Sequence, residues 1–221
     1  MVTPDRFQTL NSVLARRQPD LTILSENVHK SHNLAAIIRS CDAVGVFRAH
    51  VVSNSPKLPR HHLTSAGSRK WVPIVIHADI ASAIGCLKND GFQVLAAHLS
   101  AQARDFREID YTAPTALLLG SELVGVSAEA AGLADAHLKI SMQGHTESLN
   151  VSVAAALILY EAMKQREAAG MYEHSRLDPK TWQQTLFEWA YPDIARRCRE
   201  KKLMYPALSA DGQLLENPFK S

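Results

Sequence analysis

The segment Thr115-Ala-Leu-Leu-Leu-Gly-Ser-Glu-Leu-Val-Gly-Val-Ser127 decides the fold class of this chain. Its first five residues are almost all apolar, which predicts a short strand buried on both faces, as in a parallel sheet. The glycines that follow have the spacing of a phosphate-binding loop, but Val126 stands where such a loop carries lysine. Glu122 would also repel a triphosphate. The segment therefore disfavours an NTP-using enzyme and leaves open that Gly120 and Gly125 only close a tight strand-to-helix turn.

Strands and helices alternate along the chain on both sides of this segment. Apolar runs predict strands, and apolar residues at helical spacing predict helices. This alternation is typical of an α/β fold with a mostly parallel sheet flanked by helices. The first expected strand begins with residues 21–24, and the others cover 46–52, 72–76, 93–98 and 115–119. The expected helices cover 3–18, 31–45, 80–90 and 149–167. The helix at 31–45 is expected to be capped near Ser31.

The residues after position 167 form a separate helical tail. A helix is expected from Asp178-Pro179, with Trp182, Leu186 and Trp189 on one side, and Pro192 ends it before a basic helix. We therefore divide the chain into an N-terminal helical extension (1–20), a main α/β domain (21–167) and a C-terminal helical tail (168–221).

Composition narrows the setting of the protein. The chain has 221 residues and a net charge of +2, and its three cysteines form no CxxC pair, so we expect a cytoplasmic protein without disulfides or a zinc ribbon. The pair His61-His62 has no third ligand in its pattern, so no metal is expected. The start of the chain lacks an apolar leader and the most apolar run, 151–160, is too short to cross a bilayer, so no membrane association is expected.

Polar residues at two helix starts are candidates for chemistry. Asn33 and Arg39 lie about 120° apart around one helix, so both can face one cleft, although a surface amide and a solvated arginine are the alternative. Ser148, Asn150 and Ser152 stand at the entry of a largely apolar helix. Capping would explain one of these three side chains, so a further role is open for the others.

Basic residues are unevenly placed despite the small net charge. Local patches of this kind can hold a polyanion, and the alternative is ordinary solvated charge. They include Arg16-Arg17, Lys164 with Arg166, and the bases of the tail.

Three segments, read together and in order, resemble a known family. They are Asn33-Leu-Ala-Ala-Ile-Ile-Arg39, the stretch 119–127, and Ile140-Ser-Met142 continuing to Ser148-Leu-Asn-Val-Ser152. The chain resembles the SpoU-type branch of the SPOUT superfamily of RNA 2'-O-methyltransferases, and most closely the members that modify guanosine 18 of tRNA. Further matching stretches, at 14–20, 28–33, 95–100, 105–111 and 171–172, extend the resemblance over nearly the whole chain.

The resemblance implies a fold, a methyl donor and site residues. It implies a C-terminal trefoil knot in which S-adenosylmethionine binds, a homodimer, and tRNA as the substrate. The candidates for contact with that RNA are Arg16, Arg17, Lys164 and Arg166, with the bases of the tail. Arg17 and Arg166, which flank the matching segments, are the two we expect to matter most. The implied donor-pocket residues are Ala97, His98, Leu99, Gly120, Ile140, Met142 and Leu149. The implied catalytic residues are Arg39, Asn33, Glu122, Ser148 and Asn150. A ribosomal RNA 2'-O-methyltransferase of the same family and a non-catalytic RNA-binding module are the alternatives.

Arg39 presents an energetic question under this reading. An arginine has a reference pKa of about 12.5 or higher, so neutralising one near pH 7 costs roughly 7 kcal/mol at 1.36 kcal/mol per unit. Either a dry site lowers that pKa, or Arg39 stays charged, grips a phosphate and stabilises the developing oxyanion. We favour the charged role.

Overall fold

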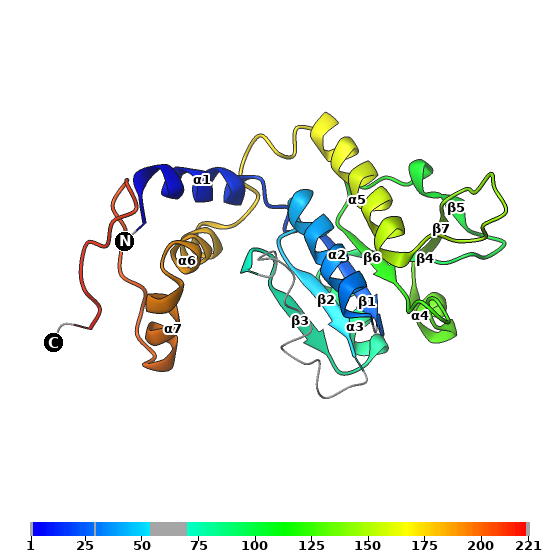
Figure 1. Ribbon diagram of the computed structural model, residues 1–221, viewed down its shortest axis with the longest axis horizontal. Helices are drawn as coiled ribbons and strands as arrows, with labels where there is room; N and C mark the ends of the chain where they lie inside the picture. Colours follow the sequence, from blue (N-terminus) through cyan, green and yellow to red (C-terminus); the bar gives the residue numbers. More distant parts are fainter. Residues whose placement is uncertain (1, 29, 54–69, 220–221) are drawn as a thin grey trace. The chain divides into compact units, whose positions relative to one another are not determined.

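The computed structural model describes residues 2–28, 30–53 and 70–219. Within these residues, seven strands form one sheet in the order β3-β2-β1-β6-β4-β7-β5, and every neighbouring pair is parallel (Figure 1). The strands are β1 (Leu21–Glu26), β2 (Ala49–Val52), β3 (Ile74–His77), β4 (Gln93–Ala97), β5 (Arg104–Asp105), β6 (Thr115–Leu119) and β7 (Ala136–Lys139). The expected α/β fold with a mostly parallel sheet is confirmed.

Helices cover both faces of the sheet. Helices α2 (Ser31–Ala43) and α5 (Val151–Ala168) pack together on one face, and α3 (Ile80–Asn89) and α4 (Ala128–Leu133) pack together with the other core. Strand β6 shows why the sequence folds this way: Leu117 and Leu119 join the first core, whereas Ala116 and Leu118 join the second. Alternate residues of a strand point to opposite faces, so a strand buried on both must be apolar throughout.

The sheet order places the loops that carry the candidate residues at one edge. The chain runs outward from β1 to β3 and then returns to the other side of β1, where β6 lies between β1 and β4. The carboxyl ends of β1, β6, β4 and β7 therefore meet at one edge. In open parallel sheets, ligands bind beyond this edge at the point where the strand order reverses.

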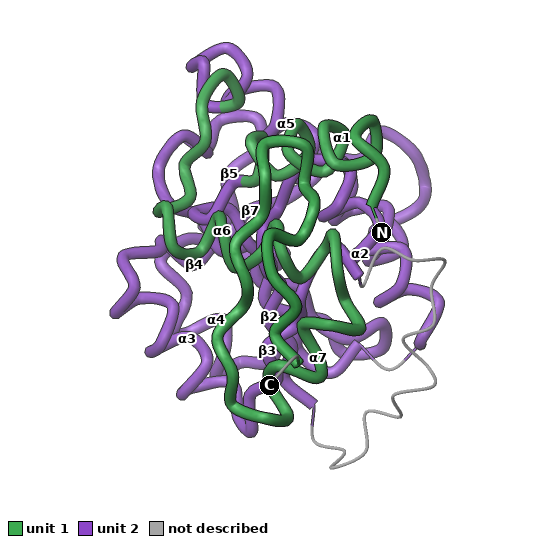
Figure 2. Tube along the Cα trace, turned by 90° about the vertical axis from the view of Figure 1, so that its left-hand side faces the viewer, with its two compact units in different colours: residues 1–17, 172–221 green, residues 18–171 purple. Residues whose placement is uncertain are grey.

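The two chain extensions belong to one compact unit of residues 1–17 and 172–221, and residues 18–171 form the other (Figure 2). In the first unit, α1 (Pro4–Ala15) packs against α6 (Pro179–Ala190), which leads into α7 (Pro192–Glu200). The boundaries lie at 17/18 and 171/172, a few residues from those expected, and the sequence pattern gave no sign that the two extensions pack together.

Several local expectations need correction. Helix α2 has Lys30 at its N-cap position, with no side-chain capping bond, so the predicted cap at Ser31 is wrong. Strands β5 and β7 and helix α4, which are two, four and six residues long, were not expected. The basic segment 54–69, with His61-His62, lies outside the described residues. In the part of the chain that is described, no helix is long and apolar enough to cross a membrane.

Candidate active site

Three side chains from distant parts of the sequence meet at the carboxyl edge of the sheet. Asn33 of α2 donates from Nδ2 to Glu122 Oε1 at 2.7 Å, and Asn150 donates from Nδ2 to Asn33 Oδ1 at 3.2 Å. The backbone N–H of Lys30 also donates to Glu122 Oε1, at 3.3 Å. Asn33 is buried, which makes these hydrogen bonds necessary, because a buried amide without partners is costly. Three of the five predicted catalytic residues therefore form one connected group.

The turn that carries Glu122 depends on its two glycines. Ser121 and Gly125 exchange backbone hydrogen bonds, each at 3.0 Å, and Gly125 has a φ of +68°, a conformation that favours glycine. A Cβ added at Gly120 would lie 2.0 Å from the carbonyl carbon of Gly125, so only glycine fits there. The tight turn that the sequence analysis considered is thus present. It places Glu122 next to α2.

Asn150 has two partners because it also begins helix α5. Its Oδ1 accepts from the backbone N–H of Ser152 at 2.8 Å and from Ser152 Oγ at 2.6 Å, while its Nδ2 reaches Asn33. Capping of α5 thus accounts for the oxygen of Asn150. Its amide nitrogen ties the start of α5 to α2.

A pocket with mostly apolar walls opens between the ends of β4 and β7 and the start of α5. Six of the seven residues predicted for the donor pocket line it: Ala97, His98, Leu99, Ile140, Met142 and Leu149. Ser148 lines it too, so the pocket adjoins the loop that leads to Asn150. Gly120, the seventh predicted residue, is buried at the start of the turn described above and does not line the pocket. Sequence patterns did not single out Lys139 and Glu147, which also line the pocket.

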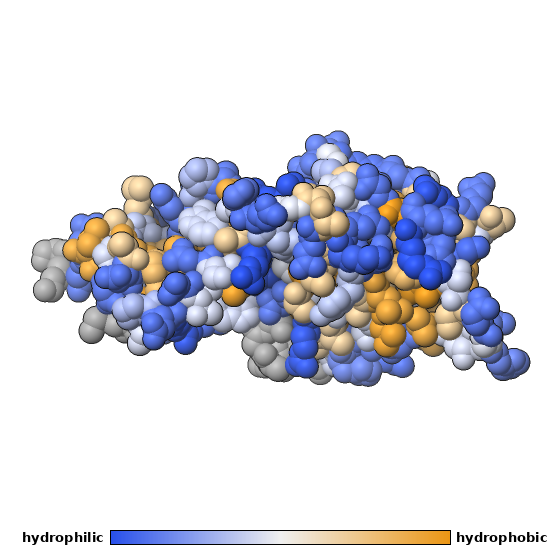
Figure 3. Space-filling model, turned by 90° about the horizontal axis from the view of Figure 1, so that it is seen from above, coloured by the Kyte–Doolittle hydropathy of each residue, from blue (hydrophilic) through white to orange (hydrophobic). Residues whose placement is uncertain are grey.

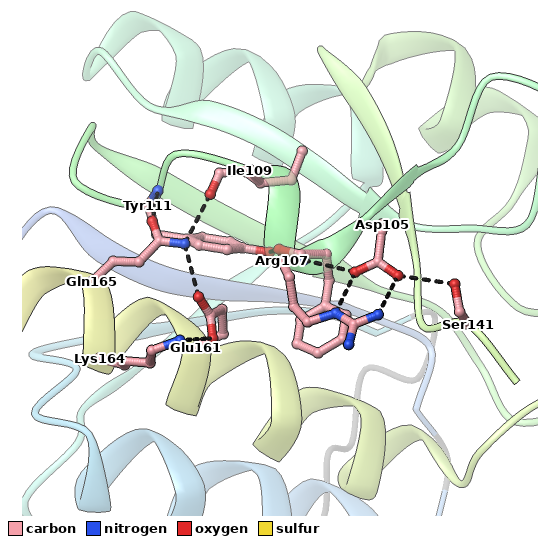
Figure 4. A network of polar contacts seen from close by, with 9 residues as sticks. Asp105, Arg107, Ile109, Tyr111, Ser141, Glu161, Lys164 and Gln165 are labelled. Atoms are coloured by element: carbon pink, nitrogen blue, oxygen red, sulfur yellow. Dashed lines mark hydrogen bonds and ion pairs between the residues drawn. The ribbon is translucent and has the colours of Figure 1, made fainter.

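A polar network holds the loop after β7 at Ser141, which lies between two of the pocket residues (Figure 4). Arg107 binds Asp105 through two nitrogens, at 2.8 and 2.9 Å, and Ser141 Oγ donates to Asp105 Oδ2 at 2.9 Å. The Arg107 guanidinium and the Ser141 hydroxyl hold the pKa of Asp105 well below its usual range. Asp105 is therefore a carboxylate near pH 7, and it fixes Ser141 between the pocket residues Ile140 and Met142.

Arg39 and Ser148, the other two predicted catalytic residues, are not part of this hydrogen-bonded group. Arg39 is exposed on α2, six residues after Asn33, and makes no hydrogen bond or ion pair to any described residue. Ser148 is exposed at the pocket. Both side chains are accessible to a substrate, but the structure records no contact that joins them to the group formed by Asn33, Glu122 and Asn150.

Comparison with known proteins gives this site its family. The model of the SpoU rRNA Methylase family matches residues 20–160, and the model described as SpoU, rRNA methylase, C-terminal matches residues 164–217. The chain belongs to the SpoU methylase family. The resemblance found in the sequence is thus confirmed, and the chain is a methyltransferase by membership of that family.

Individual relatives match over most of their length. A protein of Thermus thermophilus named tRNA (guanosine(18)-2'-O)-methyltransferase is 54% identical over 187 residues, which cover 85% of this chain and 96% of that protein. The protein of the same name in Escherichia coli strain K12 is 48% identical, over 96% of this chain and 94% of its own. The solved structure described as A. aeolicus TrmH/SpoU tRNA modifying enzyme has a TM-score of 0.79 and 43% identity, over 86% of this chain and 97% of that one.

Two of the predicted RNA-contacting arginines in this family member are buried, which corrects that prediction. Arg166 is 0% exposed, and all its nitrogens donate to Gln18, Asp20, Tyr111 and Ala113. Arg17 is 1% exposed and lies over the Trp189 ring, with 5.3 Å from its guanidinium carbon to the ring centroid. The sequence alone does not show whether backbone carbonyl groups enclose a basic side chain.

The other two predicted RNA contacts lie on the surface. Arg16 and Lys164 are exposed, and Lys164 pairs only with Glu161, at 3.3 Å, within the described residues. Sequence reasoning missed Glu26, a buried acid that ends β1 beside the site. The available signal was an acidic residue at the carboxyl end of an apolar strand.

Proposed function

We propose that the chain transfers a methyl group from S-adenosylmethionine to the ribose 2'-oxygen of guanosine 18 in tRNA. The observation that carries the proposal is the hydrogen-bonded group of Asn33, Glu122 and Asn150 beside the apolar pocket. Relatives at 48 to 54% identity that bear the name of this activity support it.

The pocket suits the donor. Its wall is mostly apolar, and an adenine ring and a sulfonium substituted with carbon are better matched to such a wall than phosphate is. A solved structure of 28% identity and a TM-score of 0.62, described as a SpoU methyltransferase in complex with the cofactor AdoMet, supports this ligand for the pocket. The donor supplies an activated methyl group and its leaving group. The residues of this chain must align the ribose hydroxyl and lower the energy of its developing anion.

Arg39 is the residue we assign to the oxyanion. A charged guanidinium can hold the phosphate next to the target ribose through two parallel hydrogen bonds and still place positive charge near the 2'-oxygen. Its exposure and its lack of a partner among the described residues leave it able to do so. Asn33, Glu122, Ser148 and Asn150 position the substrate or Arg39.

A second copy of the chain completes the proposed enzyme. Apolar residues of α5 at spacing i, i+4 and i+7 form an exposed stripe, Val153, Leu157 and Tyr160, which are 47%, 42% and 49% exposed. Apolar side chains gather on this part of the surface in the space-filling view (Figure 3). We infer a homodimer packed through this stripe. Leu157→Glu should convert a dimer to a monomer in analytical ultracentrifugation, whereas Lys164→Glu on the same helix should not.

RNA contacts, fold and location complete the proposal. We assign RNA contact to the exposed Arg16 and Lys164. The trefoil knot and the cytoplasmic location stay predictions. Cys41, Cys86 and Cys198 form no disulfide in the described part of the chain.

One assay tests the reaction and its substrate. Purified protein is incubated with methyl-labelled S-adenosylmethionine and an unmodified tRNA transcript, and the label is located by nuclease digestion. The proposal expects the label on the 2'-oxygen of guanosine 18, and a transcript with 2'-deoxyguanosine at that position should take up none. The family model's description names ribosomal RNA, which is the second candidate. Label in ribosomal RNA and none in the transcript would favour it.

A further inference from the structure

Glu26 is a buried acid at the edge of the sheet that none of the chemistry above uses. It ends β1, is 5% exposed and belongs to a residue type that is rarely buried without a purpose. Its Oε2 accepts from the backbone N–H of Ser127 at 3.0 Å. Ser127 closes the glycine turn that carries Glu122, and its own hydroxyl accepts from the backbone N–H of Ala130 to begin α4.

The position of that turn depends on its two ends. The residues in its middle, Leu123 and Val124, are 95% and 81% exposed, so they pack against little of the described chain. At the first end, Gly120 follows Leu119 of β6, which pairs in register with Ser25 of β1. At the second end, the carboxylate of Glu26 holds the Ser127 N–H. Neighbouring positions of β1 therefore fix both ends.

We propose that Glu26 is a positioning residue for methyl transfer: it fixes the turn at Ser127 so that Glu122 meets Asn33. The inference rests on the proposed function. Glu122 can bind Asn33 at 2.7 Å only if the turn holds its place, and misplacement by about 1 Å can reduce a rate by about 100-fold. The donor pocket is lined from β4, β7 and α5, so Glu26 should have no effect on donor binding.

Three variants test the assignment. Glu26→Ala removes the acceptor and should lower kcat at least about tenfold, while the Kd for S-adenosylmethionine, measured by calorimetry, changes less than about twofold. Glu26→Gln keeps an oxygen that can accept from Ser127 and should retain most of kcat. Asp79→Ala is the matched control, because Asp79 caps α3 by accepting from Ser82 N–H at 2.7 Å, away from the turn. It should lower the melting temperature and leave kcat unchanged.

A double-mutant cycle separates positioning from a general structural role. If Glu26 acts through Glu122, Glu26→Ala should cost little further activity in a Glu122→Ala background. Equal losses in both backgrounds, an unchanged kcat in Glu26→Ala, or a loss of donor binding that parallels the loss of kcat would each overturn the assignment. Absence of methylation by the unmodified chain would instead refute the proposed function.

Discussion

Asn33 and Glu122 are 89 positions apart in the sequence, yet the amide nitrogen of one lies 2.7 Å from a carboxylate oxygen of the other. Asn33 is the middle member of a chain of hydrogen bonds, because it donates to Glu122 and accepts from Asn150. The first bond joins the turn that carries Glu122 to helix α2, and the second joins α2 to the start of α5. The buried amide of Asn33 therefore connects the other two side chains. The methylation rate should depend on which of its atoms donates and which accepts.

Asn33→Asp replaces the amide nitrogen, which donates to Glu122, with a carboxylate oxygen that can only accept. Two carboxylates would face each other at hydrogen-bond distance, which raises the pKa of the pair, since like charges disfavour ionisation. We expect Asn33→Asp to lower the methylation rate more than about tenfold near pH 8. The rate should recover in part as the pH falls, because a protonated carboxyl can donate again.

Asn33→Ala supplies the control for this pH effect. It removes the donor without adding a charge, so its rate relative to the unmodified chain should not depend on pH. The measurement is single-turnover methyl transfer between pH 6 and 9. Identical pH profiles for the two variants would show that the polarity of this bond is unimportant.

The sequence predicted what depends on local pattern. The apolar run at 115–119 predicted β6 at its observed bounds, and the helix expected over 31–45 is observed as α2 over 31–43. Six of the donor-pocket residues came from the family resemblance and not from spacing. Periodicity alone could not bring the ends of β4 and β7 to the start of α5.

What failed depends on tertiary contacts. Arg166 was predicted to contact RNA as a basic residue that flanks a segment of the family match, but the fold encloses it with carbonyl groups of residues 20, 111 and 113. Glu26 was not among the residues predicted from the sequence. Its role depends on Ser127, about 100 positions later, and nothing in the local sequence indicates that pairing.

Arg39 should be sensitive even to a change that keeps its charge. Arg39→Lys retains a cation but loses the planar fork that can hold a phosphate and stabilise an oxyanion together. We expect kcat to fall about 10²- to 10³-fold, as for loss of an oxyanion-stabilising donor, with donor affinity within about twofold of the unmodified chain. The control is Arg48→Lys, an exposed arginine just before β2. Near-full activity of Arg39→Lys would contradict both roles considered for this residue.

A histidine pair at the edge of the sheet should make stability depend on pH. His50 Nδ1 lies 2.8 Å from His77 Nε2, and burial, with the charges of His77 and Arg48, lowers the pKa of His50 to about 4. The folded pKa is below the unfolded value of 6.5, so the stabilisation is complete above that value. It is lost as the pH falls from about 6.5 toward 4, because the unfolded chain binds the proton more readily.

Denaturant unfolding at several pH values measures this contribution. Between pH 7 and pH 5 the free energy of unfolding should fall by about 2 kcal/mol on account of His50. His50→Gln should show a correspondingly smaller fall over the same range, whatever its stability at pH 7. Parallel curves for the two proteins would mean that His50 does not contribute to the pH dependence.

Arg166 should act through folding and not through RNA contact. Its side chain makes five hydrogen bonds, including one of 2.6 Å to Asp20 Oδ1, and it links α5 to the segments before β1 and before β6. Arg166→Ala would leave buried acceptors without a donor, so the free energy of unfolding should fall by about 3–5 kcal/mol. Lys164→Ala, two residues away and exposed, should change the free energy of unfolding by no more than about 0.5 kcal/mol.

The salt dependence of tRNA binding separates a role in folding from a role in RNA contact. Lys164→Ala should flatten the slope of log affinity against log salt concentration, because one phosphate contact is lost, whereas folded Arg166→Ala should leave that slope unchanged. A flattened slope in Arg166→Ala without loss of stability would restore this arginine to the RNA-contacting surface.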